Sequence, residues 1–437
     1  MSSMLGRSLR RAGAALVLLA LILWNAWVAH TMVTKLQMSD FRIFYLSARA
    51  QLEGRDIYDL PSELQTHGGR TLRLTLVNLN PPHFLLLLLP LALFPAGVAL
   101  SLWAAASLLC LGGSIYVIAR ELDLKPSWPS CWRGAVWLLA FAGMGAVLAT
   151  GEMSFLLSLP LTLAWAAARR GRWSRAGIYL GLAMSLKLFL LIFIPYFVLR
   201  RRLAAAVASC AAASACFVAG TLIFGPGSYW SWLSQLPSVS WAWRSPNASV
   251  LGILTRSLTE NPYYAPIAVA PSLVLPVWLL AVAIVGVLTL VAVTFDRTES
   301  AVDRAFALLL LAALLISPLG WLYYLWLGLG PMAALALEWR NGTGRDPQDA
   351  GAAAARWRRR FLSLAVPGLV WPHFATFAYQ PHAWATLLVA SAYFWSTAAL
   401  WCAIVLDWWA VNLRTARPGG VSTARQQSGV RRTCQRP

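Results

Sequence analysis

Long apolar runs separated by short basic segments dominate the chain. The runs at 97–119, 203–223 and 271–294 are close to the roughly 20 apolar residues that a helix needs to cross a bilayer. Further apolar runs lie at 13–30, 133–149, 154–168, 304–316, 321–337, 361–378 and 385–412. This pattern predicts an all-α, polytopic integral membrane protein with about ten to twelve transmembrane helices.

Composition and charge support this class and add an orientation. Of 437 residues, 59% are hydrophobic and 12% charged, whereas a soluble chain carries about 25% charged residues. We read the net charge of +20 as a topology signal, because basic residues beside membrane spans stay in the cytoplasm. The six cysteines form no CxxC spacing, so we expect lone thiols and no metal or redox site.

One topology places all the basic clusters on the cytoplasmic side. Residues 1–412 then form a single domain in the bacterial inner membrane, with both termini cytoplasmic and a basic, disordered tail at 413–437. Residues 31–96 become a long first outer loop. The first apolar run also fits a cleaved signal peptide, but we expect a retained helix because the rest of the chain is itself membrane-embedded.

Two apolar segments interrupt the simple alternation of spans. The stretch 176–199 has arginines at both ends, which favours two short helices that are broken near Lys187 and enter and leave on one side. A single span is the alternative. The segment 81–95 is short and rich in proline, so we place it in the outer interface or in a re-entrant loop.

Polar residues that packing does not explain gather at the predicted outer boundary. Asp40 opens a segment with aromatic and small residues at helical spacing, which favours an amphipathic surface helix. Its carboxylate could face a membrane-level cavity or only cap the helix that begins at Phe41. Lys187 lies in an apolar run, where a charge costs on the order of 2.5 to 3.5 kcal/mol, so we expect it to face a polar cavity or an anion. Snorkelling to the interface and pairing with Glu152 are the alternatives.

A series of short motifs runs in order from about residue 20 to about residue 340. The first outer loop carries Asp40, Phe41, Tyr45, Ala48, Ala50, Leu52, Gly54, Tyr58 and Asp59. Later motifs are Asn80-Pro81-Pro82, Pro90-Leu91, Gly151-Glu152, Gly181-Leu182-Ala183 with Lys187 and Arg200 to Arg202, Asn247 with Ser249, and Ser317-Pro318 with Trp321, Tyr323 and Tyr324. This set resembles glycosyltransferase family 87. The chain departs from the family pattern at Glu152, Asn80 and Tyr323, where many members carry Gln, Tyr and His.

The resemblance implies a membrane glycosyltransferase of the GT-C class with an active site that opens to the outer face. Such an enzyme takes a sugar from a polyprenyl phosphate, which is a substrate, so we expect no cofactor. Asp40 would be the base that removes the proton of the acceptor hydroxyl while the anomeric carbon is attacked from the opposite face. We expect a hexose, mannose first, and a lipid-linked or envelope glycan acceptor; a pentose such as arabinose is the alternative.

Nine further residues on the outer side are candidate substrate contacts, namely Tyr45, Asn80, His83, Glu152, Lys187, Arg244, Asn247, Trp321 and Tyr323. We expect Lys187 to contact the phosphate, Arg244 to contact the phosphate or the sugar, and Glu152 to hydrogen-bond sugar or acceptor hydroxyls. Exposed loop charge for Glu152, an interfacial hydrogen-bonding role for His83 and an aromatic belt for the tyrosines are the alternatives. No HExxH, GxGxxG, Walker loop or DxD cluster occurs, so we assign no metal, and we expect no nucleic-acid partner.

Two other classes of function fit many spans and a buried lysine. A transporter or lipid flippase is one, although the span pattern contains no inverted repeat and the first outer loop is unlike two matched halves. A non-catalytic scaffold that binds polyprenyl lipids is the other. Replacing Asp40 with Asn separates them, because only a transferase needs that carboxylate as a base.

Overall fold

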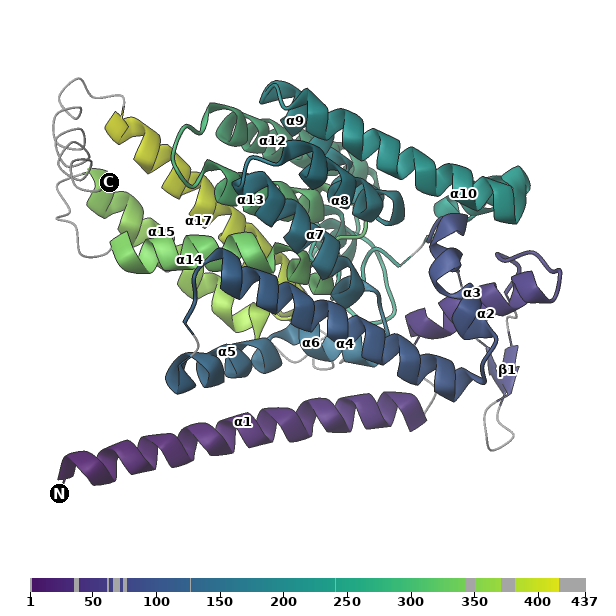
Figure 1. The fold of residues 1–437 in the computed structure, drawn as a ribbon, viewed down its shortest axis with the longest axis horizontal. Coiled ribbons are helices and arrows are strands. Elements are labelled where there is room, and N and C mark those ends of the chain that lie inside the picture. The colour runs from purple at the N-terminus through teal and green to yellow at the C-terminus, as the bar shows by residue number, and fades with distance from the viewer. Residues whose placement is uncertain are drawn as a thin grey trace, which may run out of the picture.

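The computed structural model describes residues 2–34, 39–60, 63–65, 71–73, 77–125, 127–239, 241–342, 350–370 and 382–415, and these are mostly helical (Figure 1). The α-helices of the first half are α1 (Ser2–Thr34), α2 (Ser39–Leu52), α3 (Leu89–Ala92), α4 (Ala96–Glu121), α5 (Trp128–Ala140), α6 (Ala142–Thr150), α7 (Ser154–Arg169), α8 (Trp173–Leu186), α9 (Phe193–Leu199) and α10 (Leu203–Gln235). Those of the second half are α11 (Val250–Leu258), α12 (Val274–Phe295), α13 (Ala301–Ile316), α14 (Leu329–Gly342), α15 (Ala350–Leu369), α16 (Ala383–Leu388) and α17 (Ala392–Thr415).

Short elements connect these helices. The 3₁₀ helices are η1 (Pro82–Leu87), η2 (Leu188–Ile192), η3 (Leu236–Ser238), η4 (Pro271–Leu273) and η5 (Leu322–Gly328). In the first outer loop, β1 (Glu63–Gln65) and β2 (Thr71–Arg73) form a small antiparallel hairpin.

Within the described residues, four helices are long and apolar enough to cross a membrane. They are α4, α10, α12 with η4, and α17; the pair α5 and α6, bent by 59°, makes a fifth if it counts as one span. Shorter apolar helices lie at Ala15–Thr31, Ser154–Arg169 and Leu188–Leu199. The all-α polytopic membrane fold is therefore confirmed, and several of the predicted spans are short or broken helices.

The helices divide into a buried centre and an exposed periphery. All residues of α13 from Asp303 to Leu315 are buried, and α13 packs against α7, α12, α14 and α17. In α12, by contrast, only 11% of the most apolar window is buried, which is typical of a helix that faces lipid. A helix that is apolar on all sides has to be covered by protein or by lipid, and this chain contains both kinds.

The break near Lys187 is confirmed. Helix α8 ends at Leu186, Lys187 is extended (φ −136°, ψ 97°), and the chain continues through η2 into α9. The guanidinium of Arg202, just beyond α9, lies 4.5 Å from the ring centroid of Trp173 at the start of α8. The segment therefore leaves and returns to one end of the molecule, as the arginines at its two ends predict.

Glycines explain how closely this hairpin packs on α10. A Cβ at Gly177 would lie 2.3 Å from the carbonyl oxygen of Ala205, and one at Gly181 would lie 2.3 Å from that of Ser209. Any side chain at these two positions would force α8 and α10 apart. The Gly181-Leu182-Ala183 motif thus serves helix packing.

The segment 81–95 does not span, as predicted, but it is more buried than an interfacial segment. It forms η1 and α3, and Pro82 to Leu85 are buried against the rest of the protein. Gly220 of α10 makes room for it, since a Cβ there would lie 2.6 Å from the Cβ of His83.

The predicted span at 361–378 lies partly outside the described residues, and its described part belongs to a helix that begins earlier. Helix α15 begins at Ala350 and ends at Leu369, and residues 371–381 lie outside the described part of the chain. The run of alanines and arginines before Phe361 has high helix propensity, so the helix begins early and becomes an amphipathic, arginine-rich helix packed along α17. Helix α17 continues to Thr415, and the rest of the predicted tail lies outside the described residues.

Candidate active site

A group of polar side chains that we call the Lys187 cluster (Asn80, Glu152, Lys187 and Tyr324) lies where α7 begins and α8 ends. These helices pack side by side and are joined at 170–172, so the start of α7 and the end of α8 lie at one end. The Nζ atom of Lys187 lies 3.2 Å from Oε1 of Glu152 and donates to Oδ1 of Asn80 at 3.1 Å. The pairing of Lys187 with Glu152, an alternative in the sequence analysis, is observed.

The carboxylate of Glu152 is 2% exposed, and both of its oxygens have partners. Oε2 accepts from the hydroxyl of Ser154 at 2.6 Å, and Oε1 accepts from the hydroxyl of Tyr324 at 3.1 Å. Gly151 ends α6 with a positive φ of 69°, which turns the chain so that Glu152 points inward. A carboxylate tolerates burial only with such partners, which makes this an ordered buried charge and not an exposed loop residue.

The ammonium of Lys187 is held in place by the break in the backbone. Its side chain is 15% exposed, and Nζ also lies 5.2 Å from the ring centroid of Tyr324, a cation–π arrangement. An ammonium carries three N–H donors, and Glu152 and Asn80 account for two of them. The cluster thus has a buried positive charge with remaining capacity to donate.

Asn80 ties the cluster to the first outer loop. Its backbone N–H and its side-chain amide both donate to Oδ1 of Asn78, at 3.0 and 3.2 Å. Asn78 in turn donates to Ser47 of α2 at 2.9 Å, and the hydroxyl of Tyr58 donates to the carbonyl of Asn80 at 2.7 Å. Helix α2, which carries Asp40 in its first turn, is thereby fixed against the segment that holds Asn80.

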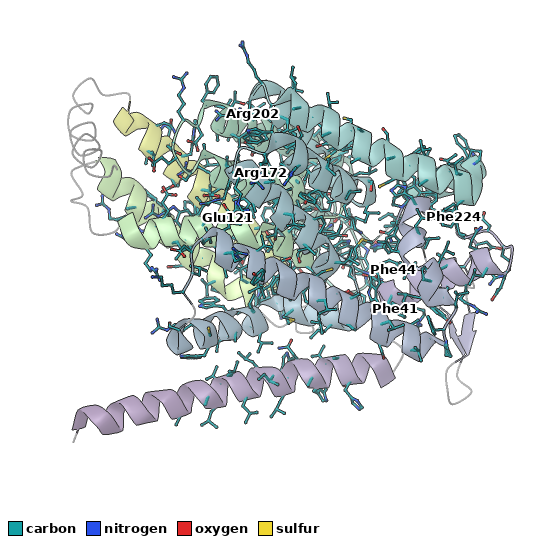
Figure 2. The ribbon with its side chains drawn as sticks, in the orientation of Figure 1. Phe41, Phe44, Glu121, Arg172, Arg202 and Phe224 are labelled. Atoms are coloured by element: carbon teal, nitrogen blue, oxygen red, sulfur yellow. The ribbon has the colours of Figure 1, made fainter. Side chains whose placement is uncertain are left out.

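Helix α2 is the predicted amphipathic helix, and its apolar face is anchored by aromatic side chains. Phe41 and Phe44, labelled in Figure 2, are buried next to Trp103, and Phe44 also meets Phe84 edge to face at 4.7 Å. Burying aromatic side chains contributes strongly to stability, so α2 has a defined position on the protein.

Asp40 lies half-buried beside the tyrosines that follow α13. Burial, and next the carboxylate of Asp40, raise the pKa of Tyr323 well above its ordinary value. Burial, then Glu152, then Asp40 do the same for the pKa of Tyr324. Both hydroxyls therefore stay protonated, and Asp40 is an electrostatic neighbour of the Lys187 cluster, although it comes from a distant part of the chain.

The wall next to Asp40 is held by a buried asparagine. The side-chain amide of Asn247 donates to the carbonyls of Pro318 and Ala242, both at 2.9 Å, and its Oδ1 accepts from the backbone N–H of Gly320 at 2.9 Å. Trp321 follows and stacks on Tyr323, with ring centroids 6.2 Å apart. Asn247 thus positions the aromatic wall through protein contacts.

Three other candidate residues have contacts that fasten elements together. Tyr45 donates to the carbonyl of Phe94 at 2.8 Å, which joins α2 to the turn before α4. His83 is buried, with Nε2 donating to the carbonyl of Ser185 at 2.8 Å and Nδ1 at 3.0 Å from the hydroxyl of Tyr229. Arg244 is exposed and lies 5.9 Å from the ring centroid of Trp241. In the described part of the chain, none of the three forms a hydrogen bond or an ion pair with Lys187 or Glu152.

Sequence reasoning missed two features of this site. Tyr324, which the pattern favours as a belt residue, is the residue that bonds Glu152. Arg256 is fully buried and donates to the carbonyls of Trp243, Arg244 and Asn247, which fixes the outer loop before the wall. A lone arginine in an otherwise apolar stretch was the available signal for the second.

The described residues contain no group of three or more His, Cys, Asp or Glu side chains arranged to hold a metal ion. The chemistry available to these residues is that of a half-buried carboxylate, an ammonium and several hydroxyl donors. Such a set can accept a proton at one point and neutralise a leaving anion at another.

Comparison with known proteins identifies the family of this chain. A family model described as glycosyltransferase family 87 matches residues 78–318, which include Asn80, Glu152 and Lys187. The polyprenol-phosphate-mannose-dependent alpha-(1-2)-phosphatidylinositol mannoside mannosyltransferase of Mycolicibacterium smegmatis is 28% identical over 366 residues, 78% of this chain and 80% of the relative. The corresponding phosphatidylinositol pentamannoside mannosyltransferase of that organism is 24% identical over 360 residues, 78% of each chain. The chain therefore belongs to glycosyltransferase family 87 and is a membrane-embedded glycosyltransferase.

Proposed function

We propose that this protein transfers mannose from a polyprenyl phosphate donor to a lipid-linked glycan acceptor at the outer face of the bacterial inner membrane. The observation that carries the proposal is the Lys187 cluster beside Asp40, at the end of α7 and α8 opposite Arg169 and Arg172. Both relatives are named as polyprenol-phosphate-mannose-dependent enzymes that act on phosphatidylinositol mannosides. Their names support the proposal of a polyprenyl phosphate donor and a lipid-linked acceptor.

In this proposal, Asp40 is the general base. It accepts the proton of the acceptor hydroxyl as that oxygen forms a bond to the anomeric carbon, and the bond from that carbon to the phosphate oxygen breaks. The polyprenyl phosphate leaves as an anion, and the configuration at the anomeric carbon inverts. Hydrogen bonding by a neutral tyrosine pair beside Asp40 supports an orienting role for Tyr323 and Tyr324.

Lys187 is the proposed phosphate contact. Its ammonium has one donor beyond those used by Glu152 and Asn80, and a positive charge stabilises the negative charge that develops on the leaving phosphate. Glu152 and Asn80 then act as positioning residues, because they fix the ammonium from the protein side. Trp321, stacked on Tyr323, is the proposed platform for a sugar ring.

A transport assay and a transfer assay on one preparation test this function. Purified protein in vesicles is given polyprenyl phosphate carrying labelled mannose or labelled arabinose, together with a phosphatidylinositol mannoside. We expect labelled mannose in the acceptor lipid. Arabinose in the acceptor would support the pentose alternative, whereas donor that crosses the bilayer without transfer would identify a flippase and overturn the proposal.

The orientation is tested separately with an impermeant thiol reagent. Cys131 is exposed and lies within the basic segment 120–133, which we propose to be cytoplasmic. In a variant that keeps Cys131 as its sole cysteine, the reagent should react only after the membrane is opened. A second variant with Ser39→Cys as its sole cysteine should react in intact cells, and the reverse pattern would place the site inside.

A further inference from the structure

A cavity of about 260 Å³ lies at the end of the molecule opposite the Lys187 cluster. Helices α4 and α8 form its walls, and small residues of α7, Ala166 and Ala167, form part of its lining. Four guanidinium groups line it, those of Arg120, Arg170, Arg172 and Arg175. Figure 2 labels Arg172 and Glu121 just left of the centre of the view, and Phe41 and Phe44 to the right of it.

The four arginines that line this cavity carry more positive charge than the nearby carboxylate of Glu121 can balance. Glu121 bonds Arg170 at 2.6 Å and is shared with Arg169, whose Nε lies 3.4 Å away. Within the described part of the chain, Arg120, Arg172 and Arg175 form no ion pair with a carboxylate. The four arginine side chains are exposed, so water screens their mutual repulsion, and a bound anion would replace that repulsion with attraction.

The backbone adds to this preference. Helix α8 begins at the cavity, its first turn contains Arg175, and no side chain caps its N-terminal amides. The N-terminus of a helix carries a partial positive charge and unpaired N–H groups, which favour an anion. Guanidinium groups bind phosphate oxygens in pairs, which makes phosphate the anion that suits this set best.

The apolar walls favour a lipid over a free phosphate. Tyr116 and Leu109 lie on the face of α4 that carries Arg120, at helical spacing, and are 61% and 76% exposed. Ile178 and Leu182 follow Arg175 in the same way on α8 and are 46% and 42% exposed. An apolar strip therefore runs along each wall from the arginines toward the middle of the helices, where acyl chains would lie.

We propose that this cavity binds the phosphate headgroup of an anionic glycerophospholipid, with the acyl chains along α4 and α8. Basic pockets between transmembrane helices recognise lipid headgroups in this way. The proposal concerns a second site and does not depend on the reaction at the Lys187 cluster. The arginines favour a phosphate group as the ligand. The apolar strips indicate that this phosphate belongs to a lipid.

Native mass spectrometry of the full-length protein in detergent tests the site. Phosphatidylglycerol and phosphatidylcholine are titrated against wild type and the double variant Arg172→Gln/Arg175→Gln. We expect the variant to bind phosphatidylglycerol about tenfold more weakly, because two charge-assisted contacts are lost, and phosphatidylcholine equally. The matched control is Arg133→Gln/Arg297→Gln, which removes the same charge at two exposed arginines outside the cavity. It should bind phosphatidylglycerol like wild type.

Two results would overturn the proposal. An equal loss in the control variant would mean that diffuse charge, and not the cavity, attracts the lipid. Displacement of phosphatidylglycerol by millimolar inorganic phosphate would mean that the ligand is a free anion. If the Gln variant does not fold, Arg172→Lys/Arg175→Lys takes its place. Lysine keeps the positive charge but cannot form the two parallel hydrogen bonds that a guanidinium donates to a phosphate. Unchanged phosphatidylglycerol affinity in that variant would also contradict the proposal.

Discussion

The ion pairs around Arg304 and the Lys187 cluster are built differently. Around Arg304 of α13, which is 1% exposed, the guanidinium bonds Asp296 at 2.6 Å and Asp407 at 3.0 Å. Arg358 bonds the second oxygen of Asp407 at 2.5 Å. In the Lys187 cluster, a single ammonium meets one carboxylate, and the side chain is 15% exposed.

We propose that this difference separates a structural group from one that binds substrate. In the Arg304 group, two guanidinium groups face Asp296 and Asp407, and Glu338 lies 3.9 Å from Arg304. Each positive charge therefore has a carboxylate partner within the protein, and these ion pairs fasten α12, α13, α15 and α17. In the Lys187 cluster, neutral Asn80 and Tyr324 complete the contacts, and a further carboxylate, Asp40, lies nearby. A site that binds and releases an anion needs the second arrangement.

The largest expected effect on stability comes from breaking the first group. Arg304→Met leaves Asp296 buried without its ion-pair partner and leaves Asp407 with Arg358 alone, which should lower the free energy of unfolding by about 3 to 5 kcal/mol. Thermal unfolding in detergent measures it, with exposed Arg297→Met as the control. Transfer per folded molecule should stay unchanged, and a stable but inactive Arg304 variant would contradict the distinction.

In the Lys187 cluster, Lys187→Met should weaken binding of the donor. Loss of a charged hydrogen bond to phosphate costs about 1.5 to 3 kcal/mol, so we expect donor binding about 10- to 100-fold weaker. Titration with a polyprenyl phosphate sugar measures it, and exposed Lys125→Met is the control. Unchanged donor affinity would remove Lys187 from the phosphate contact.

Glu152→Gln should have a smaller effect. The amide oxygen can still accept from Tyr324 and Lys187, while the charge that fixes Lys187 is lost, so we expect transfer to fall by less than about tenfold. Steady-state kinetics with the donor varied should assign most of the change to KM. A loss of activity as large as that of an Asp40 variant would indicate that Glu152, and not Asp40, is the base.

The smallest expected effect is a pH dependence at His83. Burial lowers the pKa of His83, partly opposed by its hydrogen bond to the carbonyl of Ser185. The unfolded chain then binds the proton more readily, so stability should decrease as pH falls below about 6.5, by at most about 1.4 kcal/mol per pH unit. Thermal midpoints between neutral and mildly acidic pH measure it. His83→Gln should reduce the slope and exposed His382→Gln should not; equal slopes in all three proteins would contradict it.

Much of this fold follows from simple sequence patterns. Arginines at both ends of 176–199 predict the hairpin broken at Lys187, and a buried lysine predicts a partner such as Glu152. The position of α13 at the centre does not follow, because an apolar helix covered by protein has the same composition as one covered by lipid. Helix α15 was missed at its start because amphipathic arginine-rich segments have no hydropathy peak.

The site is harder to predict than the fold. The family resemblance indicates that Asp40, Glu152 and Lys187 belong to one site. It does not predict the hydrogen bond between Tyr324 and Glu152, because these residues are 172 positions apart in the sequence. Asn247 and His83 carry the same polar groups as a substrate contact, and only their distances to backbone carbonyls assign them to protein hydrogen bonds. Such pairings depend on tertiary packing, which periodicity does not encode.

The central claim is that Asp40 removes the acceptor proton. In Asp40→Asn, the amide keeps the size of the side chain and cannot act as the base, so kcat should fall by about 100- to 10,000-fold. Donor affinity, measured on the same preparation, should match wild type, since Lys187 and its partners are untouched. Transfer at the wild-type rate, or lost donor binding with kcat unchanged, would contradict the account.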